Sequence, residues 1–275
     1  MVTEQARAKL NLALHVRRRR DDGYHELETL FAFVADGDTV TLSDEGEGFA
    51  VEGPFAGALS GEGDNLVTRA AARFVEVFGL TVPGRITLTK RLPVASGLGG
   101  GSADAAATLR LLARWHGVAL DDAWLFAVAD GLGSDVPACL YGGTAIGRGR
   151  GELLTPVAGA AGTAVLLVNP GVAVATGPVF AGWDGVDRGP LIEGDVLAVA
   201  QAGRNDLEPP ALAIAPVIGE VLAMLAAQRG ARLARMSGSG ATCFALFDNA
   251  TTRDVAAMAI RAAQPGWWCL ETVLS

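Results

Sequence analysis

The chain has 275 residues, half of them hydrophobic, and a formal net charge of −8. This length and composition allow one large domain or two of ordinary size, each with its own hydrophobic core. The acidic balance argues against nucleic acid as a partner, and the four arginines at 17–20, followed directly by two aspartates, are expected in a solvated loop. An RNA-binding module, suggested by those arginines, is a weaker alternative.

Cysteine and histidine usage excludes several further classes of protein. The three cysteines, Cys139, Cys243 and Cys269, form no C-x-x-C pair, and the three histidines are scattered. This pattern argues against a disulfide framework or a zinc site and favours reduced thiols in the cytoplasm. We expect no signal peptide, because charged residues begin at Glu4, and no membrane span, because prolines and glycines interrupt the longest uncharged stretch, 153–183.

The first half of the chain predicts strands and then helices. Residues 6–16 alternate strictly between apolar residues on one face and mostly polar residues on the other, which predicts a half-buried strand. Further strands, mainly antiparallel, are expected at 26–34, 38–43, 49–52 and 84–90. An amphipathic helix is expected over 64–79, capped by Asp64 or Asn65 and ended by Gly79. Two more helices are expected over 102–115 and 121–130.

The second half predicts two strands and then a different pattern. The strands are expected at 144–147 and 164–168, followed by a helix near Asp195 and a long helix over 211–228. A glycine-rich segment, a helix over 252–263 and a strand over 267–273 complete the chain. This mixture predicts an α+β fold, and the change of pattern near residue 155 predicts two domains, 1–155 and 156–275.

A glycine cluster lies directly before the second expected helix, in "LPVASGLGGGSADAAATLRLL" (92–112). Glycine costs about 0.5–1 kcal/mol relative to alanine inside regular structure, so a cluster needs a reason. Backbone N–H groups at a helix N-terminus bind phosphate when no side chain blocks the approach, although a tight turn is the plainer alternative. The loop lacks the lysine of a Walker A motif, which argues against that motif. It also lacks the third glycine of a complete dinucleotide-binding fingerprint, but its partial G-x-G pattern keeps a dinucleotide-binding oxidoreductase as a rival.

Three separated segments together resemble the motifs of one kinase superfamily. They are "AKLNLAL" (8–14), "PVASGLGGGSADAA" (93–106) and "MSGSGATCFALF" (236–247). Their order is similar to that of the galactokinase, homoserine kinase, mevalonate kinase and phosphomevalonate kinase (GHMP) superfamily. The resemblance implies a two-domain α+β fold with mainly antiparallel sheets, packed helices and an active site in the cleft between the domains. It also implies ATP and Mg²⁺ as cofactors.

Shorter segments resemble one branch of that superfamily. They are "DGYHEL" (22–27), "DNLV" (64–67), "GSDVP" (133–137) and "NPGVAVAT" (169–176). This branch phosphorylates the 2-hydroxyl of a cytidine-diphospho sugar alcohol in the non-mevalonate route to isoprenoids. Homoserine, mevalonate or a related alcohol is the nearest alternative acceptor. The implied partner is a small molecule, without nucleic acid or membrane, and the implied state is a monomer or weak homodimer.

The resemblance implies that the glycine loop wraps the phosphates of ATP. The residues assigned to the loop are Pro93, Val94, Ala95, Ser96, Gly97, Leu98, Gly99, Gly100, Gly101, Ser102 and Ala103. Asn65 and Lys90 match positions on the adenine side, and Ser102 is also a candidate Mg²⁺ ligand. The alternatives are helix caps for Asn65 and Ser102 and a surface lysine at a strand end for Lys90.

Lys9 and Asp135 match the two catalytic positions of the superfamily. The implied roles are that Asp135 orients the attacking hydroxyl and that Lys9 keeps the carboxylate ionised and stabilises developing negative charge. The alternatives are a helix cap for Asp135 and an exposed strand position for Lys9.

The resemblance also implies a set of acceptor-binding residues. These are Asn11, Tyr24, His25, Phe31, Thr176, Phe180, Gly238 and Gly240. Tyr24 and Phe180 would stack on the cytosine, His25 would read the base edge, and the two glycines would place a backbone turn near the transferred phosphate. The alternatives are core packing for Phe180, an exposed loop position for His25 and a plain hairpin turn for the glycines.

Overall fold

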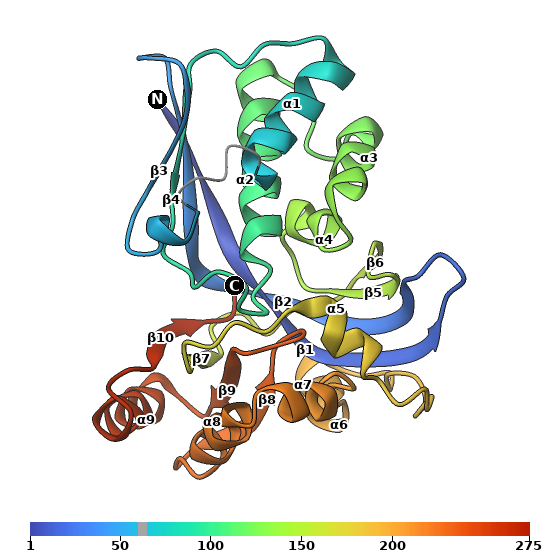
Figure 1. Cartoon of the computed structure of the whole chain (residues 1–275), viewed down its shortest axis with the longest axis vertical. Coiled ribbons are helices and arrows are strands. Elements are labelled where there is room, and N and C mark those ends of the chain that lie inside the picture. Colours follow the sequence, from blue (N-terminus) through green and yellow to red (C-terminus); the bar gives the residue numbers. More distant parts are fainter. Residues whose placement is uncertain (60–64) are drawn as a thin grey trace. The chain divides into compact units, whose positions relative to one another are not determined.

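The computed structural model describes residues 1–59 and 65–275, and their contacts divide the chain into two compact units (Figure 1). Unit 1 comprises 1–8, 36–94 and 99–142, and unit 2 comprises 9–35, 95–98 and 143–275. Strands β1 (Val2–Arg19) and β2 (His25–Ser43) pair with each other and contribute residues to both units. The expected domains, 1–155 and 156–275, follow chain order instead, and that division stays a prediction.

Unit 1 combines strands with a group of packed helices. Its further elements are β3 (Gly48–Glu52), a 3₁₀ helix (Ala56–Leu59), α1 (Leu66–Phe78), β4 (Arg85–Thr89), α2 (Gly100–His116), α3 (Ala123–Leu132) and α4 (Val136–Tyr141). β4 pairs antiparallel with β2 and parallel with β3. The long helix α2 contacts α1, α3 and α4, so its apolar residues form the centre of this unit.

The ends of α1 confirm the expected helix over 64–79. The Asn65 side chain accepts hydrogen bonds from the backbone N–H groups of Val67 and Thr68, at 2.9 and 3.1 Å. The Thr68 hydroxyl receives the Asn65 N–H in return, which completes a capping box. Gly79 ends the helix in the left-handed region, where glycine costs least. Asp64, the alternative cap, lies outside the described residues.

Unit 2 contains a four-stranded antiparallel sheet in the order β10-β7-β9-β8. Its further elements are β5 (Ala145–Gly149), β6 (Leu153–Pro156), β7 (Ala164–Asn169), α5 (Thr176–Ala181), α6 (Val196–Ala202), α7 (Glu208–Ile214), α8 (Val217–Ala226), β8 (Ala231–Met236), β9 (Cys243–Phe247), α9 (Ala250–Ala263) and β10 (Trp268–Val273). α8 packs on β8 and β9, whereas α9 packs on β10 and β7 (Figure 1). In the described part of the chain, no helix has the length and apolar character needed to cross a membrane.

Two element boundaries correct the expectations from sequence. The strands expected at 26–34 and 38–43 are one continuous strand, β2. Its Gly37 marks a close approach of strands rather than a turn, because a Cβ there would lie 2.1 Å from the Ala6 carbonyl oxygen. The helix expected over 211–228 is two helices, α7 and α8, because Pro216 forces Ala215 out of the helical region, to φ −135° and ψ 83°.

β1 is buried on both faces over residues 8–16, which corrects the expectation of a half-buried strand there. Its apolar face is fully buried, and the opposite face carries Lys9, Asn11 and His15 at exposures of only 2–3%. The exposed-lysine alternative for Lys9 is therefore wrong. Buried polar side chains need hydrogen-bond partners, so this face has to be built into a polar network.

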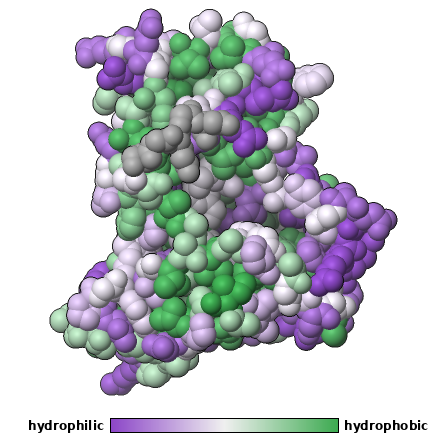
Figure 2. Space-filling model, viewed as in Figure 1, coloured by the Kyte–Doolittle hydropathy of each residue, from purple (hydrophilic) through white to green (hydrophobic). Residues whose placement is uncertain are grey.

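The arginine run at the end of β1 is paired within unit 2. Arg17 lies 2.8 Å from Asp187, Arg18 lies 3.6 Å from Glu26, and Arg20 lies 2.9 Å from Asp22. Arg19 donates to two backbone carbonyls, those of Ala181 and Trp183. The tip between β1 and β2 is accordingly hydrophilic on the face seen in Figure 2. The expected loop is wrong for residues 17–19, which lie in β1, although Arg18 and Arg19 are exposed to solvent. Each of the four guanidinium groups has a protein partner, which argues against an array of free cations for RNA.

A buried charge cluster ties the polar interior of unit 1 together. The Lys90 ammonium donates to Asp38 of β2 and, at 2.8 Å, to Asp104 of α2, and all three side chains are at most 3% exposed. The other oxygen of Asp38 accepts from the backbone N–H groups of Arg91 and Leu92. Both ends of the glycine loop are therefore attached to one carboxylate–ammonium–carboxylate cluster. Burial is the main cause that raises the pKa of Asp104 to about 7.

The raised pKa predicts a pH-dependent effect of Asp104→Asn. Between the ordinary pKa of 3.8 and about 7, the folded protein holds a proton that the unfolded chain releases, so Asp104 makes the unaltered protein less stable as pH rises. The asparagine variant does not titrate and therefore lacks this pH-dependent loss of stability. Its unfolding free energy relative to the unaltered protein should increase from pH 4 to pH 7, as urea denaturation would measure.

Asp121→Asn, at an exposed carboxylate of the same unit, is the matched control and should leave this difference flat. A relative stability of Asp104→Asn that stays level or falls with rising pH would contradict the assignment.

Candidate active site

A hydrogen-bonded chain of polar side chains lies on β1 and β2 in unit 2. The Lys9 Nζ donates to Asn11 Oδ1 at 2.9 Å, and Asn11 Nδ2 donates to the Thr29 hydroxyl at 2.8 Å. The Lys9 ammonium also lies 5.3 Å from the centre of the Phe31 ring, within the range of a cation–π contact. The structure thus brings together three of the predicted site residues, Lys9, Asn11 and Phe31. It adds Thr29, which no sequence motif marked.

The two glycine-rich segments meet beside this polar chain. Gly97 has a φ of +76°, and a Cβ there would lie 2.3 Å from the Ser237 carbonyl oxygen. Gly238 has a φ of +54°, and a Cβ there would lie 3.1 Å from the Gly97 oxygen and 3.3 Å from Asn11 Oδ1. The Ser237 hydroxyl donates to the Gly97 oxygen at 3.0 Å. Glycine is therefore required by backbone conformation and by close backbone contact.

Asn205 holds the second glycine turn in place. Its amide nitrogen donates to the carbonyl oxygens of Met236 and Gly238, both at 2.8 Å, and its amide oxygen accepts from the Leu207 N–H. Asn205 is 5% exposed, so these bonds are buried. The turn with Gly238 and Gly240 connects the antiparallel strands β8 and β9, which confirms the hairpin alternative, whereas a role of these glycines near the transferred phosphate stays a prediction. Asn205 was not anticipated, since its contacts depend on residues about 30 positions away.

The N-terminal end of α2 carries the rest of the loop, in unit 1. Gly99 is the N-cap, in the left-handed region, and as a glycine it has no side chain to cap the helix. The expected start at Ser102 is wrong, and so is its N-cap alternative, because Ser102 lies in the first turn. An uncapped glycine terminus presents backbone N–H groups and the positive end of a helix dipole, which favour an anion.

Lys90 and Asn65 have well-defined structural roles in unit 1. The surface alternative for Lys90 is wrong, because its ammonium is buried between Asp38 and Asp104. Asn65 caps α1, as the alternative expected. Contact of either residue with adenine stays a prediction.

Asp135 occupies the N-cap position of α4 without capping it. Its backbone has φ −86° and ψ −14°, and its side chain makes no capping hydrogen bond to the helix. Pro137 near the start of α4 suits a helix N-terminus without any help from a side chain. The cap alternative therefore does not explain why an aspartate stands here. Asp135 belongs to unit 1 and Lys9 to unit 2.

Aromatic side chains surround His25 in unit 2. The ring of His25 lies 5.0 Å from that of Phe180, and the ring of Trp183 meets it edge-on at 5.8 Å. Burial, and then the charge of Arg19, lower the pKa of His25 from 6.5, so the imidazole is neutral at pH 7. Among the residues that the structure describes, none is a hydrogen-bond partner for the buried His25 Nε2. The exposed-loop alternative for His25 is wrong, and Trp183 is a neighbour that sequence reasoning missed.

The other two predicted acceptor residues lie close to further polar groups of unit 2. Tyr24 is half exposed, with the Arg150 guanidinium 5.0 Å from its ring centre. Thr176, at the start of α5, has its hydroxyl 3.1 Å from that of Ser239. Thr176 therefore joins the second glycine turn, next to Gly238 and Gly240.

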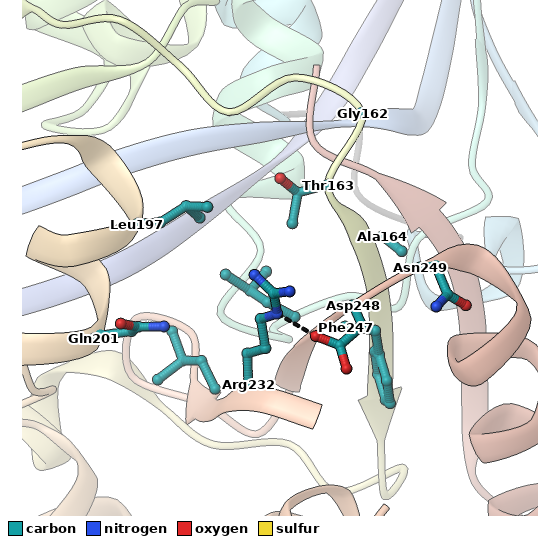
Figure 3. Close-up of a pocket in the computed structure, with 11 residues that line it drawn as sticks. Gly162, Thr163, Ala164, Leu197, Gln201, Arg232, Phe247, Asp248 and Asn249 are labelled. Atoms are coloured by element: carbon teal, nitrogen blue, oxygen red, sulfur yellow. Dashed lines mark hydrogen bonds and ion pairs between the residues drawn. The ribbon is translucent and has the colours of Figure 1, made fainter. Parts of the chain in front are cut away.

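A separate pocket in unit 2 contains none of the predicted site residues (Figure 3). Its lining includes Leu197 of α6, Phe247 of β9, and Arg232, which pairs with Asp248. The paired charges leave no clear preference for an anion or a cation.

Two family models match the chain. Residues 65–143 match the GHMP kinases N terminal domain, and residues 190–265 match the GHMP kinases C terminal domain. A crystal structure of homoserine kinase from Cytophaga hutchinsonii, 20% identical, covers 98% of this chain and 96% of its own with a TM-score of 0.66, which shows the shared fold.

Three more similar proteins are named as kinases of a cytidine-diphospho-methylerythritol. The 4-diphosphocytidyl-2-C-methyl-D-erythritol kinase of Rhizorhabdus wittichii is 57% identical over 99% of this chain and 94% of its own length. The protein of that name from Novosphingobium aromaticivorans is 54% identical over 97% and 90%. A crystal structure of 4-(cytidine 5'-diphospho)-2C-methyl-D-erythritol kinase is 37% identical, with a TM-score of 0.81 over 100% of this chain and 99% of its own. The chain therefore belongs to the 4-diphosphocytidyl-2-C-methyl-D-erythritol kinase family of ATP-dependent GHMP kinases.

Proposed function

We propose that this kinase transfers the γ-phosphate of ATP to the 2-hydroxyl of 4-diphosphocytidyl-2-C-methyl-D-erythritol. The products are ADP and the 2-phosphate of that alcohol, in the non-mevalonate route to isoprenoid precursors. The observation that carries the proposal is 57% identity over 99% of the chain to a relative named for this acceptor. The clustering of Lys9, Asn11 and Phe31 in unit 2 supports it.

The ATP phosphates are proposed to bind at the glycine loop and the uncapped end of α2. Within the loop, residues 94–102 would supply backbone N–H groups there, because Pro93 has none and that of Ala103 already bonds to the Gly99 carbonyl, and the glycine N-cap has no side chain to compete with an anion. Asn65 and Lys90 are proposed on the adenine side. Because the buried Lys90 ammonium already binds two carboxylates, its backbone is the more suitable part for adenine.

Mg²⁺ is proposed to accompany the ATP phosphates, with Ser102 as one protein ligand. Among the residues that the structure describes, no three His, Cys, Asp or Glu side chains are grouped so that they could hold a metal. That sparse donor set fits Mg²⁺, which usually keeps several waters and binds few protein groups besides substrate phosphates. The ion would neutralise charge on the phosphates.

Asp135 and Lys9 are proposed to act on the attacking hydroxyl. Asp135 accepts the hydroxyl hydrogen and aims the oxygen at the γ-phosphorus, while Lys9 stabilises the negative charge that develops. An ionised carboxylate is a weak base for an alcohol, but phosphoryl transfer is loose and the proton leaves late.

The cytidine end of the acceptor is proposed to bind at Tyr24, His25 and Phe180. Stacking on an aromatic ring contributes about 1–3 kcal/mol per base, and a neutral imidazole both donates and accepts a hydrogen bond. His25 is neutral at pH 7, and its Nε2 has no hydrogen-bond partner among the described residues. The edge of the cytosine base is proposed to supply that partner. A cytoplasmic location and a monomeric or weakly dimeric state stay predictions.

The deciding experiment is ADP release from Mg-ATP with three alcohols in parallel. The cytidine-diphospho alcohol should be turned over, whereas homoserine and mevalonate should not, and CDP should inhibit by competing at the cytidine site. Turnover of another alcohol alone would keep the kinase and overturn the acceptor. NADH binding in a fluorescence titration would favour the oxidoreductase instead.

Replacing the proposed base should separate chemistry from binding. Asp135→Asn keeps the shape of the side chain but cannot accept the proton, so kcat should fall by about 10²–10⁴-fold. ATP affinity, measured by equilibrium titration, should change by less than about twofold, because the nucleotide does not need the carboxylate.

Asp121→Asn, at an exposed carboxylate that follows α2 in the same unit, is the control and should retain full turnover. Turnover of Asp135→Asn close to that of the unaltered enzyme would remove Asp135 from the mechanism.

The neutral His25 predicts how pH affects cytidine binding. Since burial lowers its pKa below 6.5, affinity for CDP should be level above pH 6.5 and fall as the pH drops through the lowered pKa, where the ring gains its proton. The phosphates of CDP also titrate, so the comparison is with His25→Gln, which donates and accepts but does not titrate. The same fall in both proteins would exclude His25 as its cause.

A further inference from the structure

We propose that Thr29 is a positioning residue that sets the orientation of the Asn11 amide and, through it, the place of the Lys9 ammonium. The inference rests on the role proposed above for Lys9. Thr29 is fully buried on β2, so its hydroxyl acts through its neighbours and not on the substrate.

The hydroxyl of Thr29 has one hydrogen, and the structure shows where it goes. Thr29 Oγ1 lies 2.8 Å from the Ala13 carbonyl oxygen, which can only accept. The hydroxyl hydrogen is therefore used on Ala13. The Thr29 oxygen can then serve its second neighbour, the Asn11 side chain at 2.8 Å, only as an acceptor.

This fixes which end of the Asn11 amide faces Thr29. Only the NH₂ end donates, so Nδ2 faces Thr29 and Oδ1 faces Lys9 Nζ, 2.9 Å away. In the flipped amide, the oxygen would face an oxygen with no hydrogen to give, and the NH₂ would face the ammonium. Both contacts would be repulsive, so the Thr29 hydroxyl excludes the flipped state.

The orientation matters because the amide oxygen helps to locate the Lys9 charge. The ammonium has the Asn11 oxygen at 2.9 Å and the Phe31 ring at 5.3 Å, so Asn11 and Phe31 both hold it in unit 2. The Asn11 oxygen in turn packs on the second glycine turn, 3.3 Å from where a Cβ of Gly238 would lie. Releasing the amide would loosen the hold of Asn11 on the ammonium and shift it from its place.

Two substitutions at Thr29 separate the contribution of its hydroxyl to kcat from that of its methyl group. Thr29→Val keeps the shape and loses the hydroxyl, so the Asn11 NH₂ loses its acceptor and only the Lys9 ammonium still opposes the flipped amide. Because a displacement of about 1 Å costs up to about 100-fold, kcat should fall by about 10- to 100-fold, while ATP affinity stays within about twofold. Thr29→Ser keeps the hydroxyl and loses the methyl, and its kcat should stay within about threefold.

A double-mutant cycle with Asn11→Ala tests whether Thr29 acts through Asn11. If it does, adding Thr29→Val to Asn11→Ala should lower kcat by less than about twofold further. If the two losses multiply in full, Thr29 acts by another route and the proposal is overturned. It is equally overturned if Val and Ser lower kcat alike, because that result would follow from loosened packing alone.

The melting temperature of each variant is measured, and its kcat is expressed per folded molecule, so that a loss of stability is distinguished from a loss of positioning. If Thr29→Val does not fold, Thr29→Cys takes its place, since a thiol is a weak acceptor of similar size, and the same loss of kcat is expected. The unaltered enzyme is assayed first with the cytidine-diphospho acceptor. Its inactivity would overturn the proposed function and this inference with it, whereas an active enzyme with an equally active Thr29→Val overturns the inference alone.

Discussion

The burial of polar side chains on β1 is the constraint from which most of unit 2 follows. Lys9, Asn11 and His15 share one face of a strand whose other face is apolar, and none can reach water. Each therefore needs a partner supplied by another segment. Thr29 serves Asn11, and Gly189 and Arg204 contact the two ring nitrogens of His15. Hydrogen bonds to these buried side chains thus hold segments distant in sequence against β1.

Close backbone contact is the second constraint, and it explains glycines that sequence reasoning assigned to ligand binding. Gly97 and Gly238 bring two loops from distant parts of the chain to within contact of each other and of Asn11. A contact this close works only if both loops keep one conformation, which Asn205 enforces on the second turn through two buried hydrogen bonds. The site is therefore built from backbone held by a few side chains, and a change at Asn205 would disturb it without touching any ligand.

A residue's role can be predicted from sequence when its partners lie within a few positions along the chain. Alternation over 6–16 places Lys9 and Asn11 on one face, but only the fold shows that this face is buried. Capping chemistry predicts α1 well, because its signals lie within a few residues, whereas Ala215 and Pro216 were overlooked inside an apolar pattern. Thr29, Asn205 and Trp183 gain their roles from distant partners, and one sequence carries no sign of such pairing.

The glycine cluster that first suggested phosphate binding has packing reasons of its own. A Cβ at Gly97 would strike the backbone of the second glycine turn, and a Cβ at Gly100 would lie 3.0 Å from the Lys90 ammonium. Gly101 would approach a Leu66 methyl group at 3.2 Å, and Gly99 adopts a left-handed conformation. An alanine at any of these positions would disturb packing or backbone whether or not a nucleotide binds there. The glycine N-cap of α2 follows from the same left-handed backbone, so the sign of an anion site is the helix end itself, where the first backbone N–H groups have no acceptor within the helix.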